Sequence, residues 1–493
     1  MSRQIDYTSL ALQVVADQCR KSFFFFVKTF WDVIIKEAPV FNWHIEYLCD
    51  ELQKLSVSIV AREQKPYDLI INIPPGTTKS TIVTIMWPVW LWVRDATIRI
   101  ITNSYSGGLS IEHATKSKDI IQSDKFRMLF PEISIRKDKS GKQNYENTQT
   151  GYRYATSTGA TITGFHAHVI INDDPQNPKQ AESESMRIQA NEHTKTLSSR
   201  KVDKANTPVV TIMQRLHEDD VTGYLLKRKG DNIRHICLPA EDCDDVKPAE
   251  LRRFYTDGLL DPRRLNRAVL QEAMIDLGSR AYAGQYMQVP TADGGNIIKE
   301  TWFRRISFAD FRALRYREPM HFFLDTAYDE KKKKTDNDPS GIISACKIGN
   351  NIYIYHAKKV WKTFPDLLKF LPEYLYANEY DSGQSTLRIE PKANGKSVVQ
   401  QLEAITDLNV TYTPTPVDRK DVRLHAVAPK VECGRVFLVE GDWNEEFIDE
   451  VCGFPTRSHD EYVDLLGYAI NYFTDTADAE LADDVDVDDL FAI

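Results

Sequence analysis

At 493 residues the chain is long enough for two or three domains, since a domain takes roughly 150 residues. A hydrophobic content of 42% with 27% charged residues argues against a disordered or fibrous chain, and seven scattered cysteines without a CxxC pair argue against a disulfide framework or a zinc site. The net charge of −9 speaks at first against a nucleic-acid partner, but residues 475–493 alone hold eight carboxylates and no Lys or Arg. We predict that this segment is an acidic, disordered tail and that the near-neutral remainder can bind phosphates through local basic clusters.

Neither a signal peptide nor a membrane span is predicted. The first apolar run, residues 23–27, is short and lies between Lys21 and Lys28. The longest apolar run, residues 82–93, is interrupted by Pro88 and is shorter than the roughly 20 residues that cross a bilayer. We expect it to form a buried, kinked helix in a protein of the reducing cytosol.

The first 240 residues alternate apolar runs with helical stretches, which is typical of a parallel α/β sheet. Strands are predicted at residues 69–73, 97–102, 168–172 and 208–213, and polar residues follow each of them. Ligands of open α/β sheets bind at the carboxyl ends of the strands, so these polar residues are expected to meet at one site.

The first strand continues into the segment PPGTTKST at residues 74–81, which resembles a phosphate-binding loop without its usual glycines. In an ATP site, Lys79 would neutralise β- and γ-phosphate charge and Ser80 would bind Mg²⁺. The residues expected to bind ATP here are Pro75, Gly76, Thr77, Thr78, Lys79, Ser80 and Thr81. By itself, however, Pro-Pro-Gly is more often a turn after a strand.

Acidic and amide side chains follow the later strands. Asp173 is expected to hold Mg²⁺ through water, and Asp174 to orient and activate the attacking water. Gln214, after the last strand, is expected to bind ATP and report the γ-phosphate to the rest of the protein. Either aspartate alone could be a helix cap or a turn residue, but their order and strand context favour a P-loop ATPase domain over residues 1–240.

The strand and helix alternation lapses over residues 241–298. This stretch is charged, contains Pro248 and Pro262, and ends in PTADGGN, which has the composition of a linker. We predict a junction region here, with the domain boundary near Gly295, and a second domain over residues 299–474.

The second domain has a different predicted order of elements. A strand at residues 321–324 ends at Asp325, and a strand at residues 386–389 ends at Glu390. A hairpin around GNN and a helix separate them, with predicted bounds of 341–348, 352–361 and 365–376. The last helix carries Asp460 and Asp464, which lie one turn apart on one face. This is the order of an RNase H-like nuclease with a mixed sheet.

Clustered carboxylates suit two Mg²⁺ or Mn²⁺ ions roughly 4 Å apart, which activate water and stabilise the leaving oxygen of a phosphodiester. We expect Asp325, Glu390 and Asp460 to be catalytic metal ligands and Asp464 to be a ligand or an outer-shell residue, while Glu461 faces away. Each acid alone is more readily explained as a helix cap or a solvated residue.

Taken in order, these motifs resemble the large terminase subunit of tailed double-stranded DNA phages, over roughly residues 20–475. Four segments resemble motifs of the family's ATPase part: FNWHIEYLCDEL, PPGTTKS, ITGFHAHVIINDDP and VVTIMQRLHEDDVTG, the last of which resembles its coupling segment. The segment AYAGQYMQVPTADGGNII resembles the junction between the family's two domains. The segments FLDTA, IEPKANGKSV, DRKDVR and FPTRSHDEYVDLLGYAI resemble its nuclease motifs.

The resemblance implies an ATP-driven motor that moves double-stranded DNA into a procapsid, joined to a metal-dependent endonuclease that cuts concatemeric DNA. It implies ATP with Mg²⁺ at the first site, two Mg²⁺ or Mn²⁺ ions at the second, and DNA binding by Lys392, Lys396, Lys420 and Arg423. The implied partners are the portal protein, the procapsid, the small terminase subunit and further copies in a pentameric ring. The implied location is the host cytoplasm, with transient docking on the procapsid and absence from the mature virion. Arg153 and Arg215 are candidates for an arginine finger.

Two alternatives stay open. A helicase-nuclease of repair or recombination would separate the strands of a duplex, and an idle virion-assembly protein would not hydrolyse ATP. DNA-stimulated ATP hydrolysis distinguishes the three.

Overall fold

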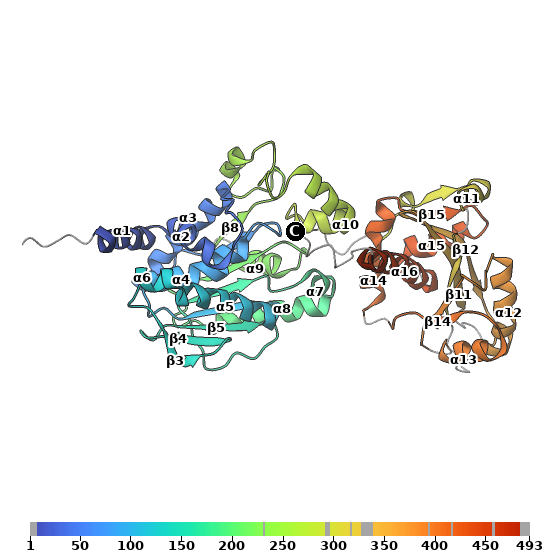
Figure 1. The fold of residues 1–493 in the computed structure, drawn as a ribbon, viewed down its shortest axis with the longest axis horizontal. Helices are drawn as coiled ribbons and strands as arrows, with labels where there is room; N and C mark the ends of the chain where they lie inside the picture. Colours follow the sequence, from blue (N-terminus) through green and yellow to red (C-terminus); the bar gives the residue numbers. More distant parts are fainter. Residues whose placement is uncertain are drawn as a thin grey trace, which may run out of the picture. The chain divides into compact units, whose positions relative to one another are not determined.

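The computed structural model describes residues 7–229, 232–290, 296–315, 318–326, 339–392, 395–415, 418–455 and 459–483. The chain divides into two compact units, which are Met1–Ala273 with Ser279–Asp293 and Met274–Gly278 with Gly294–Ile493 (Figure 1). The predicted boundary near Gly295 falls outside the described residues. Among the helices that the structure describes, none combines the length and the apolar character that a bilayer span requires.

Unit 1 is built on an eight-stranded sheet in the order β3-β4-β5-β2-β6-β7-β1-β8. Its strands are β1 (Asp68–Asn72), β2 (Ile100–Ser104), β3 (Ile135–Ser140), β4 (Asn144–Asn147), β5 (Tyr152–Ser157), β6 (Val169–Asp173), β7 (Val209–Met213) and β8 (Ile233–Cys237). The neighbours from β5 to β8 in this order are parallel. The mainly parallel α/β sheet predicted for this part of the chain is confirmed, and the four predicted strands correspond to β1, β2, β6 and β7.

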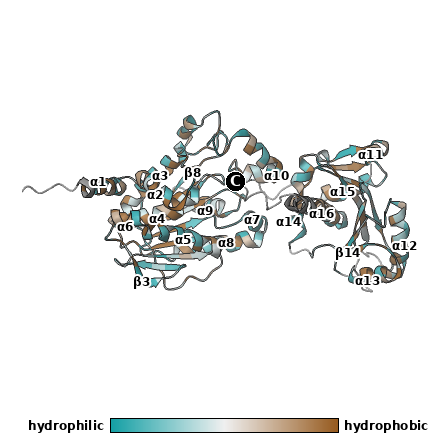
Figure 2. Ribbon diagram, in the orientation of Figure 1, coloured by the Kyte–Doolittle hydropathy of each residue, from teal (hydrophilic) through white to brown (hydrophobic). Residues whose placement is uncertain are grey.

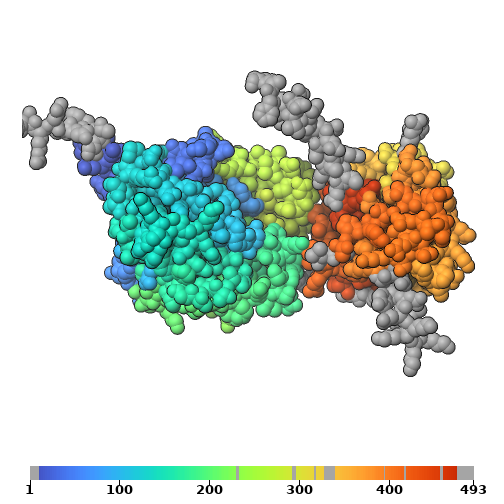
Figure 3. All heavy atoms as spheres, turned by 60° about the horizontal axis from the view of Figure 1, so that its bottom comes forward, coloured from blue at the N-terminus to red at the C-terminus, as the bar shows by residue number. Residues whose placement is uncertain are grey.

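Four strands of unit 1 were not predicted from the sequence, namely β3, β4, β5 and β8. Strands β3 and β4 pair antiparallel with each other and with β5, and they extend the sheet at one edge. Strand β3, IRKDKS, carries four exposed residues, so no apolar run marks it. The bottom of Figure 1, where β3 and β4 are drawn, comes forward in the space-filling view of Figure 3. Strand β8, IRHIC, is buried only at its end.

Helices surround this sheet. They are α1 (Tyr7–Lys21), α2 (Phe23–Ile34), α3 (Trp43–Ala61), α4 (Trp87–Arg94), α5 (Gly107–Gln122), α6 (Asp124–Leu129), α7 (Pro178–Glu182), α8 (Glu184–Ser198) and α9 (Val221–Lys229). Helix α10 (Arg267–Gln285) is kinked at Gly278, and its residues Met274–Gly278 are assigned to unit 2. Hydrophobic residues are dense on α2 and α4 (Figure 2), whose buried side chains belong to the main core of unit 1.

The kinked helix predicted for residues 82–93 is two elements, a π-helix at Thr81–Met86 followed by α4. Pro88 is the second residue of α4, which continues the π-helix without a break, since the Trp87 N–H donates to the Ile82 carbonyl. The irregularity therefore precedes the proline rather than lying at it, and it directly follows the candidate phosphate loop.

Residues 241–273, expected as part of a junction, fold within unit 1. Leu251 and Leu260 belong to its main core, and Leu259 and Leu265 belong to a smaller cluster with Tyr282 of α10. These buried leucines explain why the stretch is structured despite its charge and its prolines.

Unit 2 contains a seven-stranded sheet in the order β14-β13-β10-β11-β12-β15-β9. Its strands are β9 (Arg304–Ile306), β10 (His321–Asp325), β11 (Ser340–Ile348), β12 (Asn351–Val360), β13 (Leu387–Ile389), β14 (Val410–Tyr412) and β15 (Val436–Val439). The pairs β10/β11 and β11/β12 are antiparallel and the others are parallel. The predicted mixed sheet is confirmed. The helices are α11 (Phe308–Leu314), α12 (Phe364–Ala377), α13 (Gly395–Ile405), α14 (Lys420–Glu432), α15 (Asn444–Gly453) and α16 (Glu461–Asp483).

Helix α16 packs against β10, β11 and α14. Gly341 of β11 makes this approach possible, because a Cβ there would lie 2.9 Å from Leu465 and 3.0 Å from Glu461. The helix continues to Asp483, so residues 475–483, expected to be disordered, are helical. No Gly or Pro stops the helix after Gly467, and Ala, Glu and Leu favour its continuation. Residues 484–493 lie outside the described part.

Candidate nucleotide and metal sites

The loop after β1 encloses a cavity of about 370 Å³ at the carboxyl ends of the parallel strands. Its lining includes Pro75, Gly76, Thr78, Lys79, Ser80, Thr81, Tyr105, Leu109, Asp174, Gln176, Asn177, Pro178 and Gln214. Of the predicted ATP-binding residues, Thr77 alone is absent from this lining; its hydroxyl donates to the Pro74 carbonyl at 2.7 Å. The loop bends through left-handed residues at Gly76 (φ 75°) and Thr78 (φ 62°), so Thr78 adopts a conformation that favours glycine.

Five predicted side chains meet beside this cavity. The ammonium of Lys79 lies 3.1 Å from Asp174 Oδ2 and also donates to Gln214 Oε1. The Ser80 hydroxyl donates to Asp173 Oδ1 at 3.0 Å. The structure thus brings the ends of β1, β6 and β7 together in the way that the strand order predicted.

The two aspartates lie in surroundings that resist negative charge. Burial raises the pKa of Asp173 and of Asp174 above the usual range, and the Lys79 ammonium only partly offsets this. The buried Asp173 carboxylate and the partly buried Asp174 carboxylate favour a cation beside them, as the carboxylates of a magnesium nucleotide site do.

One contact of Asp173 was missed from the sequence. His113 of α5 places Nδ1 at 3.5 Å from Asp173 Oδ2. Burial lowers the pKa of His113 to about 4, so the ring is neutral at physiological pH. No motif marks this histidine, because it lies in the middle of a helix far from Asp173 in sequence.

The two arginines considered as arginine fingers are both engaged within unit 1. Arg153 is 1% exposed and donates to the Thr84 carbonyl at 2.8 Å and to the Ser117 hydroxyl. Arg215 is paired with Asp220. In this structure, neither guanidinium is available to reach a nucleotide on another subunit.

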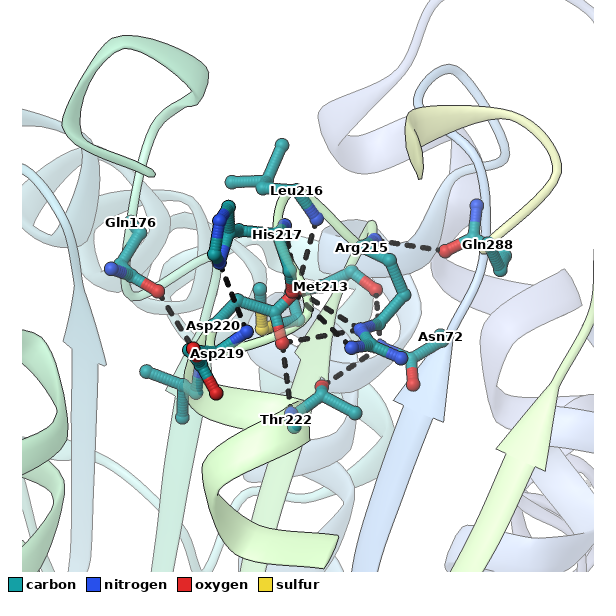
Figure 4. Close-up of polar contacts among 12 residues, drawn as sticks. Asn72, Gln176, Met213, Arg215, Leu216, His217, Asp219, Asp220, Thr222 and Gln288 are labelled. Atoms are coloured by element: carbon teal, nitrogen blue, oxygen red, sulfur yellow. Dashed lines mark hydrogen bonds and ion pairs between the residues drawn. The ribbon is translucent and has the colours of Figure 1, made fainter. Parts of the chain in front are cut away.

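Asp220 organises the loop after β7 (Figure 4). Its carboxylate accepts the Arg215 Nε–H at 2.9 and 3.1 Å and the Gly223 backbone N–H at 2.8 Å. The Arg215 backbone N–H donates to Gln288 Oε1 at 3.0 Å. Because Gln214 precedes Arg215, these contacts also fix the backbone that presents Gln214 to the cavity.

We expect Asp220→Ala to lower the free energy of unfolding of unit 1 by about 3 kcal/mol, because a buried charged acceptor of several hydrogen bonds is lost. The neighbouring Asp219→Ala is the matched control, since Asp219 is exposed and pairs with the exposed Lys227 at 2.5 Å. Urea unfolding measures both. Equal unfolding midpoints for the two variants would contradict an organising role for Asp220.

In unit 2, Asp325, Glu390 and Asp464 converge. Each offers a carboxylate oxygen, and these oxygens lie within 4.8 Å of one another. Asp325 ends β10 and Glu390 follows β13, and these strands are parallel neighbours. Asp464 comes from the first turns of α16, which packs across them. The three residues could hold a metal ion.

The cations of this site contact the acids. The ammonium of Lys420 lies 2.8 Å from Asp464 Oδ2 and 2.6 Å from Asp460 Oδ1, and Arg423 lies 2.5 Å from Asp464 Oδ1. Asp460 has a 39% exposed side chain and does not belong to the group of three carboxylates. Lys420 and Arg423, expected to bind DNA, thus lie against acids of the cluster.

The other two predicted DNA-binding residues lie at the rim. Lys392 is exposed and pairs with Glu390 Oε1 at 2.9 Å, and Lys396 is exposed at the start of α13. Glu461, expected to face away from the cluster, contacts Lys359 at 3.2 Å instead.

The electrostatics of the acidic cluster favour a bound cation. Burial, together with the neighbouring Glu390 and Asp464, holds the pKa of Asp325 well above its usual range. Burial also raises the pKa of Asp464, against the opposing effect of Lys420 and Arg423. Hard oxygen ligands of this kind suit Mg²⁺ or Mn²⁺, so the residues present fit such ions.

Residues 379–473 match the family model of the terminase RNaseH-like domain. This segment contains Glu390, Asp460 and Asp464, and the match confirms the resemblance that the nuclease motifs indicated. A comparison with curated proteins finds no match.

Solved structures similar to this chain include the large terminase of the thermophilic bacteriophage D6E, at 11% identity and a TM-score of 0.45, covering 85% of this chain and 98% of that one. The large terminase of bacteriophage HK97 is similar at 10% identity and a TM-score of 0.35, covering 88% and 95%. The terminase nuclease domain of human cytomegalovirus is similar at 15% identity and a TM-score of 0.27, covering 35% and 93%.

Proposed function

Since the chain carries a terminase RNaseH-like domain in residues 379–473, we propose that it is the large subunit of a phage terminase. In this function unit 1 hydrolyses ATP to move double-stranded DNA into a procapsid, and unit 2 cuts concatemeric DNA. The observation that carries the proposal is the presence, in one chain, of a phosphate-loop cavity with Lys79 and Asp174 and of a separate three-carboxylate cluster.

In the nucleotide site, Lys79 would leave Asp174 and Gln214 to bind the β- and γ-phosphates of ATP. Asp174, released from that ammonium, would then accept a proton from the attacking water. Ser80 and Asp173 would hold the Mg²⁺ that neutralises the phosphates. Gln214 would report phosphate occupancy to the loop that Asp220 organises.

In the nuclease site, Asp325, Glu390 and Asp464 would hold two Mg²⁺ or Mn²⁺ ions, which supply an activated water and stabilise the leaving oxygen. We propose Asp464 as the direct ligand from α16, and Asp460 as a residue that acts through Lys420. Lys420 and Arg423, which pair with Asp464 in this structure, would contact the DNA backbone beside the exposed Lys392 and Lys396.

The proposed partners are double-stranded DNA, the portal protein and procapsid, the small terminase subunit and other copies of the chain in a ring, which we propose to be a pentamer. The proposed site of action is the host cytoplasm, with transient docking on the procapsid.

The experiment that tests this function is ATP hydrolysis by the full chain with and without double-stranded DNA and procapsids. We expect both to stimulate turnover, without separation of the DNA strands. Strand separation would favour a helicase-nuclease. An absence of hydrolysis under all conditions would overturn the motor and favour a structural role in virion assembly.

A further inference from the structure

A second polar cavity, of about 470 Å³, lies at the amino ends of the parallel strands of unit 1. It is lined by Arg62, Thr97, Arg99, Glu146, Thr150, Tyr152 and His168. Arg99 immediately precedes β2 and His168 immediately precedes β6. Each of these strands is five residues long, so this cavity lies about 15 Å from the nucleotide cavity, at the opposite edge of the sheet.

Two hydrogen-bond donors face each other in this cavity with no acceptor between them. The Arg99 backbone N–H donates to His168 Nδ1 at 3.0 Å, so the neutral ring carries its proton on Nε2. His168 Nε2 then faces the Arg99 guanidinium Nη2 at 3.4 Å. A guanidinium has no acceptor, so this contact is not a hydrogen bond. An anionic oxygen placed beside both groups would accept from each.

The charges around the cavity also favour an anionic ligand. Among the described residues, no carboxylate forms an ion pair with Arg99. Arg62 pairs with Asp95 at 2.9 Å, and Glu146 is occupied by Arg136 at 2.8 Å and by Lys139 at 2.6 Å. Burial and the neighbouring Arg62 and Arg99 lower the pKa of His168 to about 4, so the ring is neutral at physiological pH.

A third cavity, of about 660 Å³, continues this edge, and Lys65, Lys201 and Lys204 contribute to its lining. It adjoins the arginine cavity through the main chain, because the Arg62 carbonyl accepts from the Asn206 side chain at 2.7 Å and the Lys65 N–H donates to the Ala205 carbonyl at 3.2 Å. Asp68 neutralises part of this charge, because it pairs with Lys65 at 2.6 Å and lies 3.8 Å from Lys201, whereas Lys204 is exposed. Two adjacent cationic cavities fit successive phosphates of a polymer better than one free ion.

We propose that the amino-terminal edge of the unit 1 sheet binds the phosphate backbone of duplex DNA, with Arg99 and His168 holding one phosphate and Lys204 a neighbouring one. The choice of DNA rests on the proposed function, whereas the anion site rests on the geometry alone. The edge is distinct from the nucleotide cavity, so DNA can occupy it in every nucleotide state.

The test uses the full chain, a labelled duplex and a range of salt concentrations. We expect Arg99→Gln to weaken DNA binding about threefold near 0.1 M salt and to reduce the slope of log K against log salt by about 0.9, the value for one lost phosphate contact. Adding Lys204→Gln should bring the loss to about tenfold, with a second, similar drop in slope. The matched control is Arg127→Gln on α6, which removes the same charge from an exposed arginine.

Calorimetric titration with inorganic phosphate in the same proteins separates the two sources of phosphate. Phosphate binding that Arg99→Gln abolishes, together with the DNA effects, supports the proposal. A loss of phosphate binding with unchanged DNA binding would overturn DNA as the ligand, and equal behaviour of Arg99→Gln and Arg127→Gln would overturn the site itself. ATP turnover without DNA, measured in parallel, reports on the opposite edge of the sheet and tests the proposed function separately.

Discussion

Lys79→Ala is expected to lower ATP turnover by at least about 100-fold, the typical cost of removing one preorganised group that stabilises charge in a transition state. The structure gives the reason, because Lys79 projects from the phosphate loop into a cavity where its ammonium pairs with Asp174 at 3.1 Å. An incoming γ-phosphate would replace that carboxylate. Cutting of plasmid DNA by the same variant should remain at the wild-type level, since the carboxylate cluster belongs to the other unit.

A matched control for this variant is Lys54→Ala. Lys54 is 65% exposed, and its partner at 2.8 Å, the buried Glu51, also pairs with Arg234, so removal of Lys54 should leave both activities unchanged. Phosphate release measures turnover, and gel analysis of nicked and linear plasmid measures cutting. Normal ATP turnover by Lys79→Ala would contradict the assignment of residues 74–81 as a phosphate-binding loop. A parallel loss of ATP turnover and DNA cutting would indicate misfolding.

The parallel strands of unit 1 and the ends that form its site could be predicted because they obey a simple rule. Strands β1, β6 and β7 are buried over their whole length, so each appears as an apolar run that stops at the polar residues of the sheet edge. Strand β3 obeys no such rule, since it is an exposed edge strand of mostly polar residues. Its place in the sheet depends on pairing with β4, and this tertiary contact leaves no pattern in the sequence of β3 itself.

Residues that act from the middle of a helix or strand could not be found in this way. His113 contacts Asp173 from α5 and Arg153 contacts Thr84 from β5, and neither belongs to a spacing that indicates a site. The opposing donors of Arg99 and His168 likewise exist only because β2 and β6 are neighbours. Periodicity assigns residues to elements, but it does not say which elements meet.

The choice between Asp460 and Asp464 as the metal ligand shows what helix periodicity alone can and cannot predict. Asp460 and Asp464 lie one turn apart, so the sequence places both on one face, and the greater freedom of a residue at the helix start favoured Asp460 as the ligand. In the structure, α16 begins at Glu461 and its approach to β11 at Gly341 brings Asp464 beside Asp325. Asp460 instead contacts Lys420 at the partly exposed end of the helix. The decisive factor was the packing distance at Gly341, which periodicity does not contain.

We therefore expect Asp464→Asn to reduce metal-dependent cutting by more than about 100-fold, beyond the 10- to 100-fold that loss of an outer-shell residue costs, and Asp460→Asn to reduce it by no more than about tenfold. Asp464 supplies an oxygen to the group with Asp325 and Glu390, whereas Asp460 lies outside this group and pairs with Lys420. Isothermal titration with Mn²⁺ should show weakened metal binding in the first variant and near-normal binding in the second.

The stability of α16 must be separated from its chemistry, because Asp464→Asn also removes the partner of Arg423 and of Lys420. Asp325→Asn serves this purpose, since Asp325 lies on β10 and contributes to the same oxygen cluster from the sheet. If metal binding is the shared role, both variants should lose cutting and Mn²⁺ affinity together while ATP turnover by unit 1 stays intact. A larger loss of Mn²⁺ affinity in Asp460→Asn than in Asp464→Asn would restore Asp460 as the ligand and would mean that α16 rotates when the ions bind.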